Sequence, residues 1–315
     1  MKKFALIGVG GYIAPRHLKA IKDTGNVLVA ALDRNDYVGV LDTYFPDADF
    51  FTEFERFDRH LEMLRRHPGS GVDYVSICSP NYLHDAHVRF ALRIGADAIC
   101  EKPLVLNPWN VVALEEAEKE TGKSINTILQ LRLHPAIVLL KERIEKSPAD
   151  KIFNVDLTYI TARGHWYTVS WKGDTGKSGG IATNIGIHFF DMLSWIFGGV
   201  KRNIVHIYEH KKAAGFLELE RARVRWFLSL DSKDLPFAPE HKKQVTYRSI
   251  TVDGEEVEFS DGFGDLHTES YRQILAGKGF RPMDVLNSVI IASDIRNARP
   301  VGLEGDYHPM LKKVL

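Results

Sequence analysis

The stretch Phe4-Ala-Leu-Ile-Gly8-Val-Gly10-Gly11-Tyr12-Ile13-Ala14 decides the fold of the first half of the chain. Its first four residues are all apolar, which predicts a buried strand, and the glycines follow this strand directly and open a helix. Gly8 permits a tight turn, and Gly10 lets backbone N–H groups approach a pyrophosphate at the helix N-terminus. Ile13 stands where the full dinucleotide-binding fingerprint has its third glycine, so we expect Ala14 to supply the small packing residue.

A carboxylate stands at the position where this motif binds a ribose. Val27–Leu32 predicts the second strand, and Asp33 ends it. A carboxylate there accepts hydrogen bonds from both ribose hydroxyls and repels a 2′-phosphate, which favours NAD over NADP. Arg34 leaves two interpretations open: it meets an additional phosphate, or it stacks on the adenine.

The two halves of the chain differ in their hydrophobic pattern. Up to about residue 130, short apolar runs alternate with helix-length segments, which is typical of a parallel sheet covered on both faces. Beyond that point, strand-like runs without intervening helices predict an α+β fold with a mainly antiparallel open sheet. We therefore predict an α/β protein with a doubly wound Rossmann domain over 1–130 and a substrate-binding and oligomerisation domain over 131–315. The elements expected in the second half are strands at Ile152–Arg163, Asn203–Glu209, Ala222–Asp231, Gln244–Val252 and Glu255–Phe259, and helices near Ile181–Phe197, His267–Leu275 and Pro282–Ala298.

The composition is that of an ordinary globular protein. The 315 residues are 44% hydrophobic and 26% charged, with 41 basic and 41 acidic side chains and a formal net charge of zero. This balance gives no reason to expect nucleic acid or a membrane as partner. Cys78 and Cys100 lie at the ends of apolar runs and are interpreted as buried free thiols, with no metal site. No cleavage site follows Lys2-Lys3, so we expect a cytoplasmic protein.

Two further segments stand where strands of the predicted parallel sheet end, which is the edge that binds ligands. They are Ser79-Pro80-Asn81-Tyr82-Leu83-His84 and Glu101-Lys102-Pro103. Pro103 restrains the backbone of Lys102 to an extended conformation. Together with the glycine motif, in this order, the segments resemble the Gfo/Idh/MocA family of nicotinamide-dependent sugar and cyclitol oxidoreductases. The resemblance extends over essentially the whole chain.

The resemblance implies two catalytic side chains. Lys102 matches the lysine that lies beside the substrate carbinol and the nicotinamide in the family. His188 matches the histidine of an Asp-x-x-x-His motif, in which Asn184 replaces the usual aspartate. An asparagine can hydrogen-bond substrate hydroxyls but cannot act as a base, so an Asp–His proton relay is not expected. The base stays open between Lys102 and His188, and a buried structural role is the alternative for His188.

A narrower resemblance extends over the segment 161–188. It includes Arg163-Gly-His-Trp-Tyr167, Ser170-Trp-Lys172 and Lys177-Ser178-Gly-Gly180, and it is similar to the UDP-N-acetyl-2-amino-2-deoxy-D-glucuronate dehydrogenases of bacterial O-antigen (lipopolysaccharide) biosynthesis. The subgroup oxidises the C3″ hydroxyl of its sugar to a ketone with NAD. It often forms homotetramers, and some members regenerate NAD with 2-oxoglutarate. The local cations of this segment suit a diphosphate and a carboxylate.

Two other activities stay open beside the UDP-sugar dehydrogenase. They are another sugar or cyclitol dehydrogenase of the same family and a non-catalytic NAD-binding sensor.

Besides the two catalytic side chains, the predicted site residues fall into a cofactor group and a substrate group. For the cofactor we predict Gly8, Gly10, Gly11, Tyr12, Ile13, Asp33, Arg34, Ser79, Pro80, Asn81, His84, Glu101 and Lys102. For the substrate we predict Arg163, Tyr167, Lys172, Lys177, Ser178, Asn184 and His188.

Overall fold

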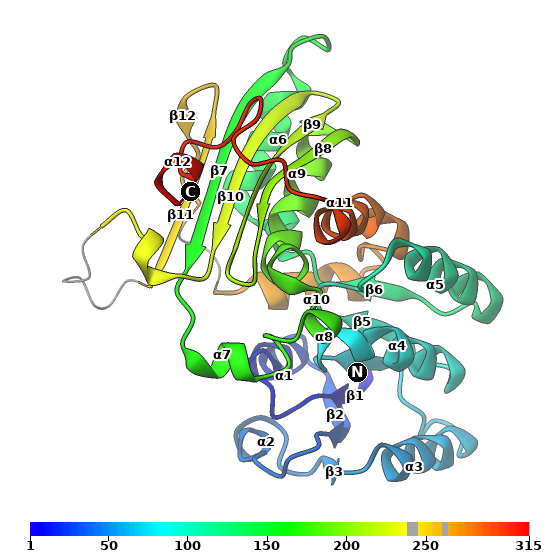
Figure 1. The fold of residues 1–315 in the computed structure, drawn as a ribbon. Coiled ribbons are helices and arrows are strands. Elements are labelled where there is room, and N and C mark those ends of the chain that lie inside the picture. Colours follow the sequence, from blue (N-terminus) through cyan, green and yellow to red (C-terminus); the bar gives the residue numbers. More distant parts are fainter. Residues whose placement is uncertain (238–244, 260–263, 315) are drawn as a thin grey trace. The chain divides into compact units, whose positions relative to one another are not determined.

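The computed structural model describes residues 1–237, 245–259 and 264–314 (Figure 1). The chain forms two compact units, Met1–Gln130 with Gly264–Leu286 and Leu131–Phe263 with Asn287–Leu315. These units differ in one segment from the domain boundaries predicted above, because Gly264–Leu286 joins the first unit. The reason is packing: Tyr271 and Ile274 of this segment lie in the buried core of the first unit.

The first unit is built on a six-stranded parallel sheet in the order β3-β2-β1-β4-β5-β6. In Figure 1 the helices lie on both faces of this sheet, with α1 and α10 on one side and α4 and α5 on the other. The doubly wound prediction is confirmed. The elements are β1 Lys3–Ile7, α1 Ala14–Asp23, β2 Val27–Leu32, α2 Val40–Tyr44, β3 Asp49–Phe51, α3 Phe54–Arg66, β4 Tyr74–Ile77, the 3₁₀ turn η1 Asn81–Leu83, α4 His84–Arg93, β5 Asp97–Cys100, α5 Pro108–Thr121, β6 Ile125–Thr127, α10 Leu266–Leu275 and the 3₁₀ turn η5 Pro282–Val285.

The core of this sheet explains where its ligand edge lies. Phe4, Ala5 and Leu6 of β1 are all fully buried, as expected for a strand covered on both faces. Because the strands are parallel, the carboxyl ends of β1, β2, β4 and β5 lie at one edge of the sheet. The glycine motif, Asp33 and the two segments at residues 79–84 and 101–103 begin at these ends. The fold therefore gathers four motifs that are far apart in the sequence.

The second unit contains a six-stranded mixed sheet in the order β12-β11-β7-β10-β9-β8. The pair β7–β10 is parallel and the other pairs are antiparallel, which confirms a mainly antiparallel sheet. The elements are the 3₁₀ turn η2 Gln130–Leu133 at the junction, α6 Pro135–Glu145, β7 Phe153–Thr161, α7 His165–Val169, α8 Thr175–Ser178, the π-turn η3 Ala182–Gly186, α9 Ile187–Phe197, β8 Val200–Tyr208, β9 Lys212–Leu219, β10 Ala222–Ser229, the 3₁₀ turn η4 Ser232–Asp234, β11 Thr246–Val252, β12 Glu255–Glu256, α11 Leu286–Asn297 and α12 Leu311–Val314.

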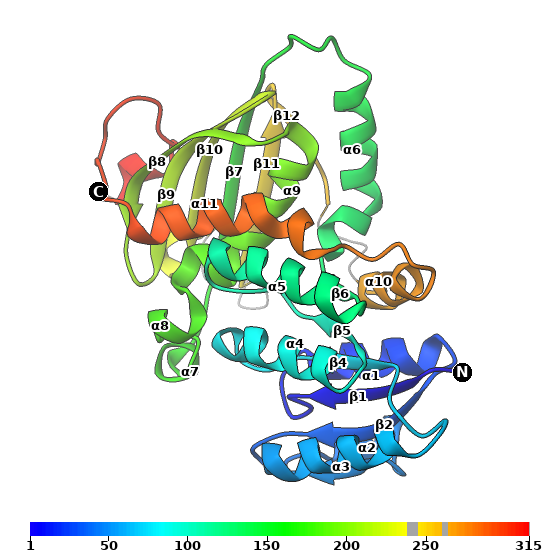
Figure 2. The ribbon, with the colours of Figure 1, turned by 90° about the vertical axis from the view of Figure 1, so that its right-hand side faces the viewer.

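The two faces of the second sheet are covered by different segments (Figure 2). On one face Trp226 of β10 packs edge-on against Phe190 of α9, with ring centroids 5.3 Å apart. On the other face Phe227 stacks on His308 at 5.9 Å, and Leu311 joins the same buried cluster. Consecutive strand residues thus face opposite layers, as the pleat requires. The C-terminal segment that carries His308 and Leu311 therefore packs on this sheet.

Several elements of the second unit were missing from the sequence prediction, among them α6, β9 and the short helices α7, α8 and α12. α6 was not predicted, and β9 was not predicted because its Lys-Ala-Ala-Gly start lacks β-branched residues. Gly215 in β9 is required by packing, because a Cβ there would lie 2.5 Å from the ring of Trp226. Gln244, the predicted start of one strand, lies outside the described residues; β11 begins at Thr246. Within the described part of the chain, no helix combines the length and apolar character that a membrane crossing needs.

Candidate functional site

The glycine loop after β1 has the geometry that a dinucleotide-binding turn needs. Gly8 has φ +90°, and a Cβ there would lie 2.7 Å from the backbone carbon of Cys78. A Cβ on Gly10 would lie 3.2 Å from the carboxylate of Asp33. A side chain at either position would therefore clash with the backbone of Cys78 or with the carboxylate of Asp33. Such a cradle fits the close approach of a pyrophosphate at the start of α1.

Asp33 lies at the end of β2 and organises the loops around it. Its carboxylate accepts hydrogen bonds from the backbone N–H of Gly10 at 2.9 Å and of Asn35 at 3.0 Å. Each carboxylate oxygen offers two acceptor sites, so capacity remains for ribose hydroxyls. Tyr12 and Arg34 are exposed and are available to a ligand at this edge. The residues present fit an NAD.

The segment after β4 is held rigidly by a buried histidine. The His84 ring lies with Nδ1 2.7 Å from the carbonyl oxygen of Pro103 and with Nε2 2.8 Å from that of Ser79. His84 thereby ties together the two strand-end segments that the sequence singled out. The Ser79 hydroxyl in turn bonds to Nδ1 of His87 at 2.8 Å. Asn81 is buried in the same turn. Direct contact of His84 with a cofactor stays a prediction.

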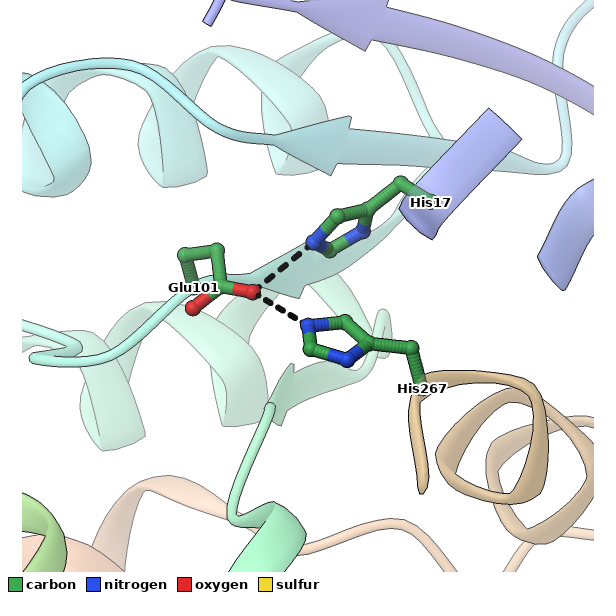
Figure 3. Close-up of side chains that lie close together, drawn as sticks. All are labelled: His17, Glu101 and His267. Carbon is green, nitrogen blue, oxygen red and sulfur yellow. Dashed lines mark hydrogen bonds and ion pairs between the residues drawn. The ribbon is translucent and has the colours of Figure 1, made fainter. Parts of the chain in front are cut away.

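Glu101, at the end of β5, is buried, and both of its carboxylate oxygens contact protein groups. Its Oε1 lies 2.9 Å from Nε2 of His17 and 2.9 Å from Nε2 of His267 (Figure 3). Its Oε2 accepts a hydrogen bond from the backbone N–H of Lys102 at 3.2 Å. Burial by itself raises the pKa of Glu101, but the hydrogen bonds from the two histidines hold it well below its ordinary value. Lys102 is half-buried and is followed by a cis peptide bond to Pro103.

The second unit places its predicted polar residues around a π-turn. Asn184 lies in this turn, η3, directly before α9, and is buried. Its side-chain amide donates a 2.6 Å hydrogen bond to the hydroxyl of Tyr167. The Arg163 guanidinium lies 5.9 Å from the centroid of the same tyrosine ring. A π-helical turn of this kind is rare in proteins, and where one is present it often lies at a functional site. Half-buried His188 follows at the second position of α9.

A pocket of about 170 Å³ opens beside this cluster. Lys172 contributes to its wall, and burial, together with the charge of Arg163, lowers the pKa of the Lys172 ammonium. A bound anion would favour the charged ammonium and so counteract both effects. The pocket residues are Tyr167, Lys172, Gly173, Thr175, Gly180, Ile181, Tyr208, Glu209, His210 and Leu230.

Two of the predicted substrate residues have local structural roles. The Ser178 hydroxyl is buried, donates to the carbonyl of Asp174 at 2.9 Å and accepts from the N–H of Gly180 at 3.1 Å. Lys177 lies on the surface, with its ammonium 3.5 Å from the carboxylate of Asp174. These contacts fold the loop before the π-turn. A role for either residue in binding substrate stays a prediction.

Sequence patterns did not reveal the partners of several buried polar groups in these sites. In the second unit Arg132 forms a two-pronged ion pair with Asp191 on α9, with N–O distances of 2.9 and 2.7 Å. In the first unit His17 and His267 converge on Glu101 from α1 and α10. His267 belongs to no recognisable motif and lies 166 residues from Glu101. Only the fold brings these partners together.

Comparisons with known proteins agree with this geometry. Residues 2–128 match the oxidoreductase family with an NAD-binding Rossmann fold (GFO_IDH_MocA), and residues 141–274 match its C-terminal alpha/beta domain. The WlbA (WbpB) dehydrogenase from Thermus thermophilus is 52% identical, with a TM-score of 0.94 over 98% of this chain and 99% of that chain. Its crystal structures are complexes with NAD and alpha-ketoglutarate and with NAD and UDP-GlcNAcA.

Curated relatives match over shorter stretches. D-glucoside 3-dehydrogenase from Escherichia coli is 29% identical over 40% of this chain and 36% of that protein. Glucose-6-phosphate 3-dehydrogenase from Bacillus subtilis is 27% identical over 62% of this chain and 54% of that protein. The matched part thus spans between about a third and a half of these curated relatives. Because both family regions match and the similarity to the Thermus dehydrogenase extends over the whole chain, the chain belongs to the Gfo/Idh/MocA family of oxidoreductases.

Proposed function

We propose that the protein is an NAD-dependent dehydrogenase that oxidises the C3″ hydroxyl of UDP-N-acetyl-2-amino-2-deoxy-D-glucuronate (UDP-GlcNAcA) to a ketone. The observation that carries this proposal is the 52% identity, over the whole chain, to the Thermus dehydrogenase crystallised with NAD and UDP-GlcNAcA. The Glu101-Lys102-Pro103 segment and His188 supply the proton-handling groups that such a reaction needs. A sensor that only bound NAD would have no need of them.

The chemistry divides between cofactor and protein. When bound, NAD accepts the hydride from the carbinol carbon, and the protein must orient the reactants and remove one proton. Lys102 or His188 takes the hydroxyl proton. A lysine ordinarily titrates near pH ~10.4 and a histidine near pH ~6.5, so His188 is the readier base unless its surroundings lower the pKa of Lys102. Asn184 binds a substrate hydroxyl without taking the proton.

The anionic groups of the substrate require local cations, because the chain as a whole is neutral. We assign Arg163 and Lys172 to the carboxylate or diphosphate, with Arg163 able to form two parallel hydrogen bonds to a carboxylate. Lys177, in α8, adds a surface cation. Exposed lysines contribute little alone, so the half-buried Lys172 is expected to matter most.

A second substrate closes the reaction cycle. We propose that 2-oxoglutarate reoxidises bound NADH, taking the hydride and a proton to become 2-hydroxyglutarate. The support is the complex of the Thermus dehydrogenase with NAD and alpha-ketoglutarate. We also propose that the protein is cytoplasmic and forms a homotetramer. Light scattering of the purified protein tests the homotetramer by its molar mass.

The test mixes purified protein, NAD and UDP-GlcNAcA and follows NADH absorbance at increasing enzyme concentrations. We expect a burst of NADH equal to the enzyme concentration. Addition of 2-oxoglutarate should then allow continuous formation of the ketone. Lys102→Met and His188→Asn should each slow hydride transfer in a single turnover by at least a hundredfold. Normal hydride transfer in both variants contradicts the assigned pair. Turnover of D-glucose 6-phosphate instead of UDP-GlcNAcA would assign the chain to another substrate of the same family.

A further inference from the structure

A compact hydrogen-bonded network lies beneath the end of β5, in the first unit alone. His17 from α1 and His267 from α10 point at the same carboxylate oxygen of Glu101 (Figure 3). The other nitrogen of His17, Nδ1, lies 2.8 Å from the hydroxyl of Tyr271, which lies 2.6 Å from the hydroxyl of Ser76. All five side chains are more than nine-tenths buried.

The protonation pattern follows from the geometry. An ionised carboxylate only accepts hydrogen bonds, so Nε2 of both histidines carries the proton. Nδ1 of His267 is buried and has no hydrogen-bond partner among the residues that the structure describes, so a second proton there would leave a charged donor unsatisfied. Burial lowers the pKa of His17, and this effect outweighs the hydrogen bond to Glu101, which raises it. Two neutral histidines therefore hold one carboxylate anion.

The distances are those of hydrogen bonds and not of a metal site. Ligand atoms that share a tetrahedral zinc at 2.0–2.1 Å lie about 3.3 Å apart. The two N–O distances at Glu101 are 2.9 Å each. The three side chains otherwise have the composition of a zinc site, so a metal is the rival that an experiment must exclude.

The second oxygen of Glu101 connects this network to the reacting end of the sheet, because it accepts the backbone N–H of Lys102. We propose that His17 and His267 are positioning residues, which hold an ionised Glu101 so that the carboxylate fixes the backbone from which Lys102 projects toward the substrate. This inference rests on the proposed role of Lys102. It also gives Glu101 a role that requires no contact with the cofactor.

The kinetic test uses His267, because it lies outside every recognised motif. His267→Leu removes the N–H donor, whereas His267→Gln restores a donor at a similar distance from the backbone. We expect His267→Leu to lower kcat about ten- to a hundredfold, as a misplaced catalytic group does, with an unchanged Kd for NADH. His267→Gln should recover most of kcat. His308→Leu, which removes another buried histidine, from the second unit, is the matched control and should lower stability but not kcat.

A double variant shows whether His267 acts through Glu101. In a Glu101→Gln background, adding His267→Leu should lower kcat no further, because the two residues act as one unit. Fully additive losses, an unchanged kcat in His267→Leu, or no recovery in His267→Gln would each overturn the proposal. So would a weakened Kd for NADH with normal kcat, since that outcome assigns Glu101 to cofactor binding.

A spectroscopic test needs no substrate, so it separates this inference from the proposed function. Nitrogen NMR of histidine-labelled protein at pH 7.5 should show His17 and His267 as neutral Nε2–H tautomers, assigned by loss of each signal in the corresponding variant. An imidazolium or an Nδ1–H tautomer at either residue contradicts the network. If the purified protein contains stoichiometric zinc and Glu101→Gln lacks it, the three side chains form a metal site and the proposed network is wrong. If UDP-GlcNAcA is not turned over but the tautomers are as expected, only the substrate assignment fails.

Discussion

At the residue scale, the conformation of Gly8 shows how strongly one position constrains the cofactor edge. Its φ of +90° is strained for any other residue, and a Cβ there would contact the backbone of Cys78 and Ser79 at under 3 Å. Backbone neighbours cannot move aside as the end of a flexible side chain can. The glycine is therefore required by the fold itself, independently of any ligand.

Gly8→Ala is expected to destabilise the protein by about 2–4 kcal/mol and to weaken NAD binding. The strain and the backbone contacts both act in the folded state, so the loss should appear in urea unfolding without ligand. Gly39→Ala is the control, since Gly39 has helical backbone angles and none of the described residues lies within 4 Å of an added Cβ. Equal stabilities of the two variants would show that the loop relaxes.

Asp33 supports a second prediction at this scale. Replacing it by asparagine removes the negative charge that repels a 2′-phosphate while keeping an acceptor for the N–H of Gly10. The ratio of NADP to NAD affinity should therefore rise about tenfold or more in Asp33→Asn, as measured by calorimetric titration of both nucleotides. An unchanged ratio would mean that Arg34 or another group sets the preference.

At the element scale, the π-turn before α9 depends on a second glycine. A Cβ on Gly186 would lie 2.7 Å from the ring of Phe190 and 2.8 Å from the side chain of Leu228. The close packing presses the turn that holds Asn184 onto the sheet of the second unit. A helix that continued without the π-turn would place Asn184 at a different angle from Tyr167.

Gly186→Ala should have a large effect on kcat and a small effect on thermal stability. The added methyl group displaces Asn184 and the start of α9, whereas the surrounding core adjusts in part. We expect kcat to fall about tenfold and Tm to fall by only a few degrees. Ser147→Ala, just after the end of α6, serves as the unaffected reference. A loss of stability without loss of kcat would show that the π-turn is structural only.

At the scale of the whole molecule, buried neutral histidines make the folded state sensitive to acid. Burial lowers the pKa of His87 and of His308 to about 4 each, and it also lowers that of His17. In the unfolded chain these groups bind protons near pH ~6.5. Below that value the unfolded state takes up more protons than the folded state, so acid favours unfolding.

We expect the free energy of unfolding to be highest above about pH 6.5 and to fall as the pH drops toward 4. Each of His87 and His308 contributes up to about 3 kcal/mol to this loss, at roughly 1.4 kcal/mol per pH unit. Urea unfolding at pH 7.5, 6, 5 and 4.5 measures it. His308→Gln should show a shallower slope than the unmodified protein, and an identical slope would mean that His308 titrates normally when folded.

Much of the fold could be read from the sequence because its cues are local. The apolar run before Gly8 and the alternation of strand and helix lengths over the first 130 residues sufficed for a parallel sheet. The second unit was harder, since the pairing of β7 with β10 joins residues far apart in the chain and β9 has weak strand propensity. The motif residues Lys102, Asn184 and His188 were predicted from the family resemblance, and their roles stay predictions.

The sequence by itself determined the cofactor turn, the positions of the strand ends and the family, because these depend on residue type and spacing along the chain. Tertiary structure alone decided what lies behind the site: the convergence of His17 and His267 on Glu101, and the pairing of Arg132 with Asp191. The physical reason is that burial and long-range contact set the protonation and orientation of these groups. A sequence pattern carries no measure of burial.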